Sequence, residues 1–248
     1  MIPASKIIRF VGKKVAYFNP IAVLARFYIN GVTKKEFHQP IFPIFNERPI
    51  EYRFVFEQIT SQYPKEILDV GTGLTSLPHL MANCGCHVTA IDNITDYWSY
   101  GLFNRHFHVI DDSIIHPQKV KGPFDLVTCI STLEHIEDYN NAVSSMISLL
   151  KPEGYLILTF PYNENKFVDN VYELPGSNTK KLPPFKTHCY SKKEVSDWIK
   201  NKASVVKQEY WQLYTGDFWT VGDRLAIPKK VDKNEAHQIS CILIKKNK

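Results

Sequence analysis

From about residue 64 the sequence alternates short apolar runs, rich in β-branched residues, with stretches whose apolar residues recur at helical spacing. Such alternation is typical of a parallel sheet that is covered by helices on both faces. The chain is therefore predicted to adopt an α/β fold. The apolar runs are residues 66–70, 87–91, 106–110, 124–130 and 155–160 and, after a gap, 204–214 and 237–244.

Helix signals lie between and after these runs. The stretches "TSLPHLMANC" and "YNNAVSSMISLLKPEG" carry apolar residues at helical spacing, and the second ends in Lys-Pro-Glu-Gly, as helix stops do. "SKKEVSDWIKN" begins with Ser191 and has Glu194 three residues later, which is the spacing of a capping box. We predict a helix over each of the three.

The first 60 residues lack this alternation, and "HQPIFPIFNERP" is interrupted by prolines. We predict an N-terminal helical and loop extension over residues 1–60 and one domain over 61–248, since this length suits a single enlarged domain. Residues 161–190 follow a strand end and are rich in Pro, Asn and Lys. Open α/β sheets bind ligands beyond the carboxyl ends of their strands, so we predict that this lid segment covers part of a substrate site.

The N-terminal end is basic, within a chain of 30 basic and 25 acidic residues. Its first 35 residues contain no acid and seven cations, namely Lys6, Arg9, Lys13, Lys14, Arg26, Lys34 and Lys35. A solvated surface is the favoured interpretation, and a contact with an anionic membrane is the alternative. The apolar residues 15–32 are interrupted by Asn19, Pro20 and Arg26, so we predict neither a signal peptide nor a membrane span, with an interfacial helix as the alternative.

Five cysteines are scattered along the chain without a disulfide framework, which predicts a reducing, cytoplasmic location. The stretch Cys84-Gly85-Cys86-His87 resembles half of a zinc site. A structural zinc usually needs a second ligand pair at matching spacing, and the sequence has none. We therefore predict core thiols and no metal.

The stretch "EILDVGTGLTSLPHLMANCGCHVTAID" is the one that points to a ligand. Gly71 and Gly73 follow a strand and precede a helix, where glycine lets a ligand approach the main chain closely. Asp92 ends the next strand, 21 residues after Gly71, and a carboxylate there suits the two hydroxyls of a ribose. A tight turn with an incidental acid is the alternative.

The residues around Gly71 distinguish a dinucleotide from a cationic nucleoside ligand. A dinucleotide fingerprint counted from Gly71 would need a third glycine where Ser76 stands. Asp69, two residues before Gly71, is a poor neighbour for a diphosphate but suits an ammonium or sulfonium cation. The pattern favours a cationic nucleoside ligand.

At this point "LDVGTGLT" resembles the first motif of the class I S-adenosylmethionine-dependent methyltransferases, although Thr75 replaces a frequent third glycine. Three more segments match in order: the strand end at Asp92, "VIDDSI", and "PFDLVTCISTLEHIED". The resemblance implies S-adenosyl-L-methionine as cofactor and a Rossmann-like, seven-stranded sheet whose seventh strand is inserted antiparallel. "SVVKQEYWQLY" and "HQISCILIKK" are the candidates for the last two strands.

The resemblance also implies which residues meet the cofactor. The first motif would hold its methionine part, Asp92 its ribose and Asp112 its adenine amino group, with the adjacent Asp111 as the alternative. The implied set is Asp69, Gly71, Thr72, Gly73, Asp92, Asp112 and Ile130.

Methyl transfer is an in-line displacement, so the protein must align the acceptor, and a hydroxyl acceptor also needs a general base. His135 in "LEHIED" is the first candidate, because histidine titrates near neutrality, and packing or substrate lining is the alternative. His188 in "THCYSKKEV" resembles a similarly placed histidine of related small-molecule methyltransferases, against an ordinary loop histidine.

Two aromatic residues are candidates for substrate contact. Tyr162 directly follows the fifth predicted strand. Trp211 lies in the aromatic stretch "QEYWQLYTGDFWT" and offers a flat surface for a sugar or a base, with core packing or a homodimer contact as alternatives.

The sequence as a whole predicts a methyltransferase that acts on a small molecule, with O-methylation of a nucleotide-linked or lipid-linked sugar preferred. The chain has no recognition helix or RNA-module signature, which disfavours a nucleic acid acceptor. A nicotinamide-dependent oxidoreductase and a non-catalytic scaffold protein with the same fold are the alternatives.

Overall fold

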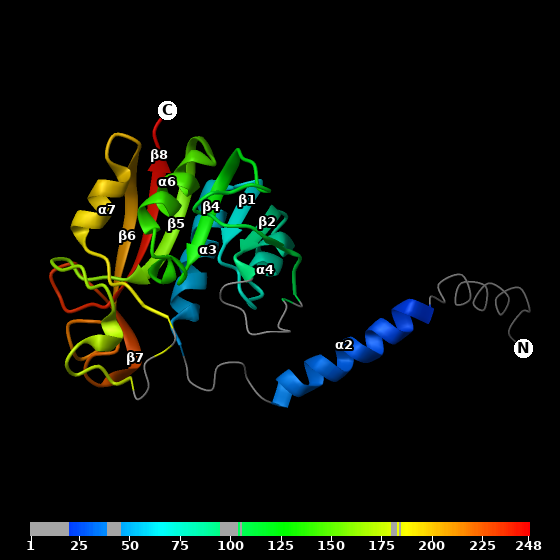
Figure 1. Cartoon of the computed structure of the whole chain (residues 1–248), viewed down its shortest axis with the longest axis horizontal. Coiled ribbons are helices and arrows are strands. Elements are labelled where there is room, and N and C mark those ends of the chain that lie inside the picture. Colours follow the sequence, from blue (N-terminus) through cyan, green and yellow to red (C-terminus); the bar gives the residue numbers. More distant parts are fainter. Residues whose placement is uncertain (1–19, 39–45, 95–103, 105, 180–182, 184) are drawn as a thin grey trace, which may run out of the picture. The chain divides into compact units, whose positions relative to one another are not determined.

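A computed structural model describes residues 20–38, 46–94, 104, 106–179, 183 and 185–248. The chain divides into two compact units, Met1–Glu47 and Arg48–Lys248. The first unit contains helix α2 (Pro20–His38), and the second is an α/β sandwich around one large sheet (Figure 1).

The described residues form a sheet of eight strands in the order β3-β2-β1-β4-β5-β8-β6-β7. Strands β1 to β5 are parallel, and β8 is inserted antiparallel between β5 and β6. This arrangement confirms the predicted α/β fold and the antiparallel insertion. The strands are β1 (Glu66–Val70), β2 (His87–Asp92), β3 (Val109–Asp111), β4 (Phe124–Ile130), β5 (Leu150–Pro161), β6 (Ala203–Tyr214), β7 (Arg224–Val231) and β8 (Ile239–Lys246).

Strand β7 makes the sheet one strand larger than the seven that were predicted. Its sequence "RLAIPKKV" contains charges and a proline, which read as a loop. Within the part of the chain that the structure describes, it is an edge strand that pairs only with β6, and edge strands tolerate proline and lysine because one side of their backbone needs no partner strand.

The second unit has four α-helices among its described residues, namely α3 (Arg48–Gln62), α4 (Leu77–Asn83), α6 (Tyr139–Ser148) and α7 (Lys192–Ile199). The predicted capping box of α7 is confirmed. The Ser191 side chain accepts a backbone N–H of the first helical turn, and the Glu194 side chain accepts the backbone N–H of Ser191. Two short 3-10 turns, η1 (Leu133–His135) and η2 (Val171–Glu173), follow β4 and β5.

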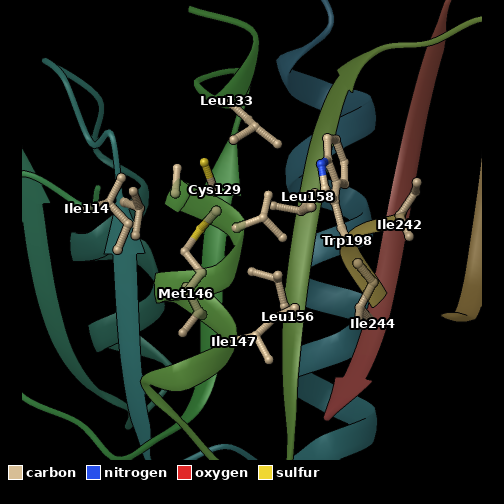
Figure 2. Packing of buried hydrophobic residues seen from close by; sticks show 14 of the residues in the cluster. Ile114, Cys129, Leu133, Met146, Ile147, Leu156, Leu158, Trp198, Ile242 and Ile244 are labelled. Atoms are coloured by element: carbon tan, nitrogen blue, oxygen red, sulfur yellow. The ribbon is translucent and has the colours of Figure 1, made fainter. Parts of the chain in front are cut away.

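Alternate residues of the central strands point to opposite faces and build two cores. On one face α6 and α7 pack on the sheet, and Figure 2 shows Met146 and Ile147 of α6 beside Leu156 and Leu158 of β5. On the other face, residues of α3 and α4 pack against Ile157 and its neighbours.

Helix α3 is part of the compact domain, so the domain starts earlier than predicted. We predicted an extension over residues 1–60, whereas the compact unit begins at Arg48. Phe54 and Val55 of α3 are fully buried in the second core, so the helix belongs to the domain. The sequence hides this, because Glu51 and Gln58 lie among the buried residues of the helix and blur its apolar stripe.

Helix α2 exposes large apolar side chains, with Ile21 at 75%, Leu24 at 71% and Phe27 at 82% exposure. No described helix combines the length and the apolar character of a membrane span. The prediction of core thiols in the stretch at residues 84–87 is wrong for Cys84, which is exposed, and Cys86 is half-buried; Cys129, Cys189 and Cys241 are buried.

Candidate functional site

A cavity lies at the carboxyl ends of β1 and β4, under the first turns of α3. The sequence placed four of its lining residues at a cofactor, and the structure brings these four together: Asp69, Gly71, Thr72 and Ile130. The remaining lining residues are Arg48, Tyr52, Val70, Thr75 and Leu77. Arg48 and Tyr52 lie in the segment that was read as an extension.

The glycine turn after β1 depends on close backbone approach. Gly71 has φ +73°, and a Cβ built on it would lie 2.0 Å from Cγ2 of Thr132. Gly73 has φ +55° with open space where its Cβ would be. L-residues rarely adopt these conformations, so the predicted need for glycine holds at both positions.

Asp92 meets the glycine turn. The N–H of Gly73 donates to Oδ2 of Asp92 over 2.6 Å, which ties the end of β2 to the turn after β1. Neither Gly73 nor Asp92 lines the cavity itself. The carboxylate that was predicted to hold the ribose thus lies next to the turn that was predicted to hold the methionine part of the cofactor.

Asp69 is a buried acid at the end of β1. Its carboxylate accepts the hydroxyls of Thr128 over 2.7 Å and of Thr72 over 2.8 Å. Burial raises the pKa of Asp69 to about 6, and these two hydrogen bonds together with the Arg48 cation limit the rise. A cation bound nearby would favour the ionised form.

This pKa predicts pH-dependent binding of a cationic ligand. Below pH 6 Asp69 takes up a proton, so we expect the affinity for S-adenosylhomocysteine, which carries an ammonium group, to fall by up to about tenfold per pH unit. Asp69→Asn should bind more weakly at pH 8 and lose this dependence. Titration calorimetry between pH 5 and pH 8 measures both, and an equal pH dependence in the variant would contradict the assignment.

The two adjacent acids at the end of β3 have different surroundings. Asp112 accepts the backbone N–H groups of Ser113, Gln118, Lys119 and Val120. Burial acts to raise the pKa of Asp112, but these hydrogen bonds outweigh it, and the pKa lies below its ordinary value. Asp111 is paired with Asp92 across β2 and β3, and its Oδ1 accepts the N–H of Ile94 over 3.2 Å.

This difference predicts separate effects for the two acids. Asp112→Asn should lower the free energy of unfolding by about 1.5–3 kcal/mol at pH 7, the range for hydrogen bonds to a charged group. The loss should shrink as pH falls through the lowered pKa, where the wild-type carboxylate is protonated as well. Asp111→Asn should leave stability unchanged. Urea denaturation of both variants checks this, and equal stability losses would contradict it.

His135 ends the turn η1 after β4. Its Nδ1 lies 2.9 Å from the carbonyl oxygen of Lys186, so Nδ1 carries the proton and Nε2 has the lone pair. Burial lowers the pKa of His135, and Arg48 and His188 lower it further, against the Lys186 hydrogen bond. His135 is therefore a neutral base at pH 7, within the electrostatic reach of the cavity residue Arg48.

Residues 48–201 match the family model that is described as a methyltransferase domain. The chain belongs to the class I S-adenosylmethionine-dependent methyltransferases. The match covers α3, so the family domain also begins where the compact unit does.

Over the aligned segments, this methyltransferase shares about a quarter of its residues with curated relatives. The ubiquinone biosynthesis O-methyltransferase of Haemophilus ducreyi is 28% identical over 73% of this chain and 84% of its own length. The enzyme of the same name from Shewanella pealeana is 25% identical, and the match spans 60% of this chain and 66% of the relative.

Solved structures share the fold. The Burkholderia thailandensis 1,6-didemethyltoxoflavin-N1-methyltransferase has a TM-score of 0.54 and 12% identity over 93% of this chain and 92% of its own. A coclaurine N-methyltransferase has a TM-score of 0.55 and 13% identity over 84% and 75%. Such low identities show the fold alone.

The cavity fits the cofactor of this methyltransferase family. The methionine end of S-adenosylmethionine carries a carboxylate beside an ammonium, and the cavity has Arg48 and Asp69 on its walls. Arginine pairs with carboxylates in a fork geometry, and aspartate attracts cations. Among the described residues no group of three or more His, Cys, Asp or Glu is placed to hold a metal ion, and the absence of a metal from the reaction stays a prediction.

The lid segment reaches His135. The ring of Phe185 lies edge-on to His135 at 4.8 Å, next to the Lys186 carbonyl that fixes its tautomer. The other predicted catalytic residue, His188, is buried and donates from Nδ1 to the carbonyl of Asp169 over 2.7 Å. Its ring packs against Tyr139, so it is placed as a core histidine.

The two predicted substrate aromatics do not line the cavity. Tyr162 is 1% exposed, and its hydroxyl donates to Glu164 over 3.0 Å. Trp211 on β6 lies under the Arg53 guanidinium, and its N–H donates to Glu209. The substrate roles of Tyr162 and Trp211 stay predictions.

Proposed function

We propose that this methyltransferase transfers the methyl group to a hydroxyl oxygen of a small molecule. The observation that carries the proposal is the neutral His135, whose unprotonated Nε2 is fixed by the Lys186 carbonyl on the other ring nitrogen. A hydroxyl acceptor needs such a base, whereas a neutral amine does not.

The donor side of the site would hold the cofactor through four charged residues. Arg48 would bind the carboxylate of S-adenosylmethionine, Asp69 would attract its ammonium, and Asp92 would accept the ribose hydroxyls. Asp111 would accept the adenine amino group, because the oxygens of Asp112 already serve four backbone N–H groups. When bound, the cofactor supplies a methyl group on a positively charged sulfur.

The acceptor side is assigned to η1 and the lid segment. Nε2 of His135 would take the hydroxyl proton as the oxygen attacks. Phe185 would line the acceptor site, since it already packs against His135.

The names of the curated relatives support oxygen as the acceptor atom, because they are O-methyltransferases of ubiquinone biosynthesis. The sugar acceptor that the sequence favoured has less support, since neither Trp211 nor Tyr162 lines the donor cavity. We keep a sugar hydroxyl as the second candidate and place a ring hydroxyl of an aromatic quinone precursor first.

The proposal is tested with methyl-labelled S-adenosylmethionine. The protein is incubated with phenolic quinone precursors and, separately, with nucleotide-linked and lipid-linked sugars, and the label is counted in the product. We expect transfer to a phenol. Binding of S-adenosylhomocysteine without transfer to any acceptor would support the scaffold alternative, and tighter binding of NADH would support the oxidoreductase.

We also propose that α2 rests on an anionic membrane surface, which would bring the enzyme to a lipid-linked or strongly apolar acceptor. Ile21, Leu24 and Phe27 are exposed, and the basic N-terminal residues would meet acidic headgroups. The cytoplasm stays the proposed compartment, since the five cysteines of the protein, all of which the structure describes, form no disulfide bond.

Vesicle sedimentation tests the membrane contact. The wild type should sediment with phosphatidylserine vesicles and less with pure phosphatidylcholine. Phe27→Asp should weaken sedimentation by about tenfold, because an exposed aromatic would no longer enter the interface. Tyr63→Asp, at a position that is 81% exposed in the second unit, is the control and should sediment like the wild type. Equal losses in both variants would refute the proposal.

A further inference from the structure

Glu51 is a buried acid that belongs to none of the sequence motifs described above. Its side chain on α3 is 0% exposed. One carboxylate oxygen, Oε1, accepts the hydroxyls of Ser131 over 2.5 Å and of Thr159 over 2.7 Å. The other, Oε2, accepts an N–H of Arg48 over 2.8 Å. A buried carboxylate is costly unless it is paired and hydrogen-bonded, and here both oxygens are used.

The contact with Arg48 shapes the donor cavity. Arg48 lies one helical turn before Glu51, and its side chain is 23% exposed. An arginine side chain has many rotamers, and pairing with a fixed carboxylate restricts them. Glu51 therefore holds the Arg48 guanidinium in the wall of the cavity, where the proposed function has it bind the cofactor carboxylate.

The contacts with Ser131 and Thr159 hold the turn that leads to His135. Ser131 has φ +45°, which is strained for a residue with a side chain. It lies between Ile130, which lines the cavity, and Thr132, whose side chain fills the space beside Gly71. The N–H of His135 in turn donates to the carbonyl of Thr132 over 3.0 Å.

We propose that Glu51 is a positioning residue for methyl transfer. Its single carboxylate group holds both the Arg48 guanidinium and the turn before His135 in place. The inference rests on the proposed role of Arg48 toward the cofactor. It explains why an acid stands in the buried face of α3, where an apolar residue would pack without the cost of burying a charge.

The inference is tested by comparing two ligands. S-Adenosylhomocysteine carries the amino acid carboxylate, whereas 5′-methylthioadenosine lacks it. Glu51→Gln keeps an oxygen for the two hydroxyls but turns an amide donor toward Arg48. We expect its affinity for S-adenosylhomocysteine to fall about tenfold and its affinity for methylthioadenosine to change less than about twofold, measured by calorimetry.

Glu57→Gln is the matched control, because Glu57 lies on the same helix and pairs with Arg53 at the surface. It should leave both affinities unchanged. In an Arg48→Ala background, adding Glu51→Gln should cause no further loss for S-adenosylhomocysteine, since coupled residues are not additive. Glu51→Asp, which keeps the charge but is one methylene shorter, replaces Glu51→Gln if that variant does not fold.

Three outcomes are distinct. Equal losses for both ligands would assign Glu51 a general structural role and overturn the inference. Additive losses in the Arg48→Ala background would overturn it as well. Failure of the wild type to bind S-adenosylhomocysteine would instead refute the proposed donor site.

Discussion

Gly71→Ala is expected to weaken the binding of S-adenosylhomocysteine severely. The left-handed conformation at φ +73° costs an alanine about 1–2 kcal/mol, and its Cβ would also lie 2.0 Å from Thr132 Cγ2. Either the turn, which lines the donor cavity, or Thr132, which packs against Gly71 and follows Ile130 of the cavity wall by two residues, must move. We expect the affinity to fall at least about a hundredfold, which corresponds to about 2.7 kcal/mol.

Gly73→Ala is the matched control for this prediction, since its Cβ would enter open space. It should retain binding within about tenfold of the wild type, because only the backbone strain acts. Adding Thr132→Ala to Gly71→Ala removes the two atoms nearest to the new Cβ and should restore part of the affinity. Calorimetry measures the affinities, and circular dichroism checks that each variant is folded. Near-wild-type binding by Gly71→Ala would show that the turn does not hold the cofactor.

His135→Gln is expected to reduce kcat about 10²–10⁴-fold, the usual contribution of a general base. Glutamine cannot take up a proton at neutral pH, although it can still donate a hydrogen bond to the Lys186 carbonyl. The affinity for S-adenosylhomocysteine should stay within about twofold, because His135 does not line the donor cavity.

The pH profile gives an independent readout of His135. Its pKa lies below the ordinary value because of burial, so the neutral, active form persists to lower pH than for a free histidine. The wild-type rate should therefore fall only below about pH 6.5, and this limb should vanish in the variant. His87→Gln, at a histidine whose side chain is 75% exposed, is the control and should keep the wild-type profile. A variant with wild-type turnover would end the assignment of His135 as base.

The fold could be predicted from the chain because its central strands are long apolar runs between helix signals. The run at residues 124–130 became β4 without a change of bounds, and Ser191 and Glu194 marked the start of α7. Strand β7 was missed, and helix α3 was assigned to the extension instead of the domain, each for its own reason. Arg224 and Pro228 suit an edge strand but read as a loop, while Glu51 and Gln58 interrupt the apolar pattern of a helix that is buried.

The donor site could be predicted where a backbone requirement fixes the residue type. Gly71 and Asp69 are recognisable because they stand two residues apart along the chain at a strand end. Glu51 and Arg48 were not recognisable, because their roles depend on Ser131 and Thr159, which lie 80 and 108 residues after Glu51. Contacts over such separations exist only in the folded chain. The same limit applies to Tyr162 and Trp211, whose neighbours Glu164 and Arg53 could not be read from the predicted strands.

The position of β8 has a consequence for how this enzyme is made. Strand β8 joins β5 to β6, yet it follows both along the chain, and its first six residues are all buried. While the ribosome is still translating residues before Ile239, β5 has an unpaired inner edge, and the hairpin of β6 and β7 cannot dock. Nascent chains that stall in this interval present an apolar strand edge to chaperones and proteases.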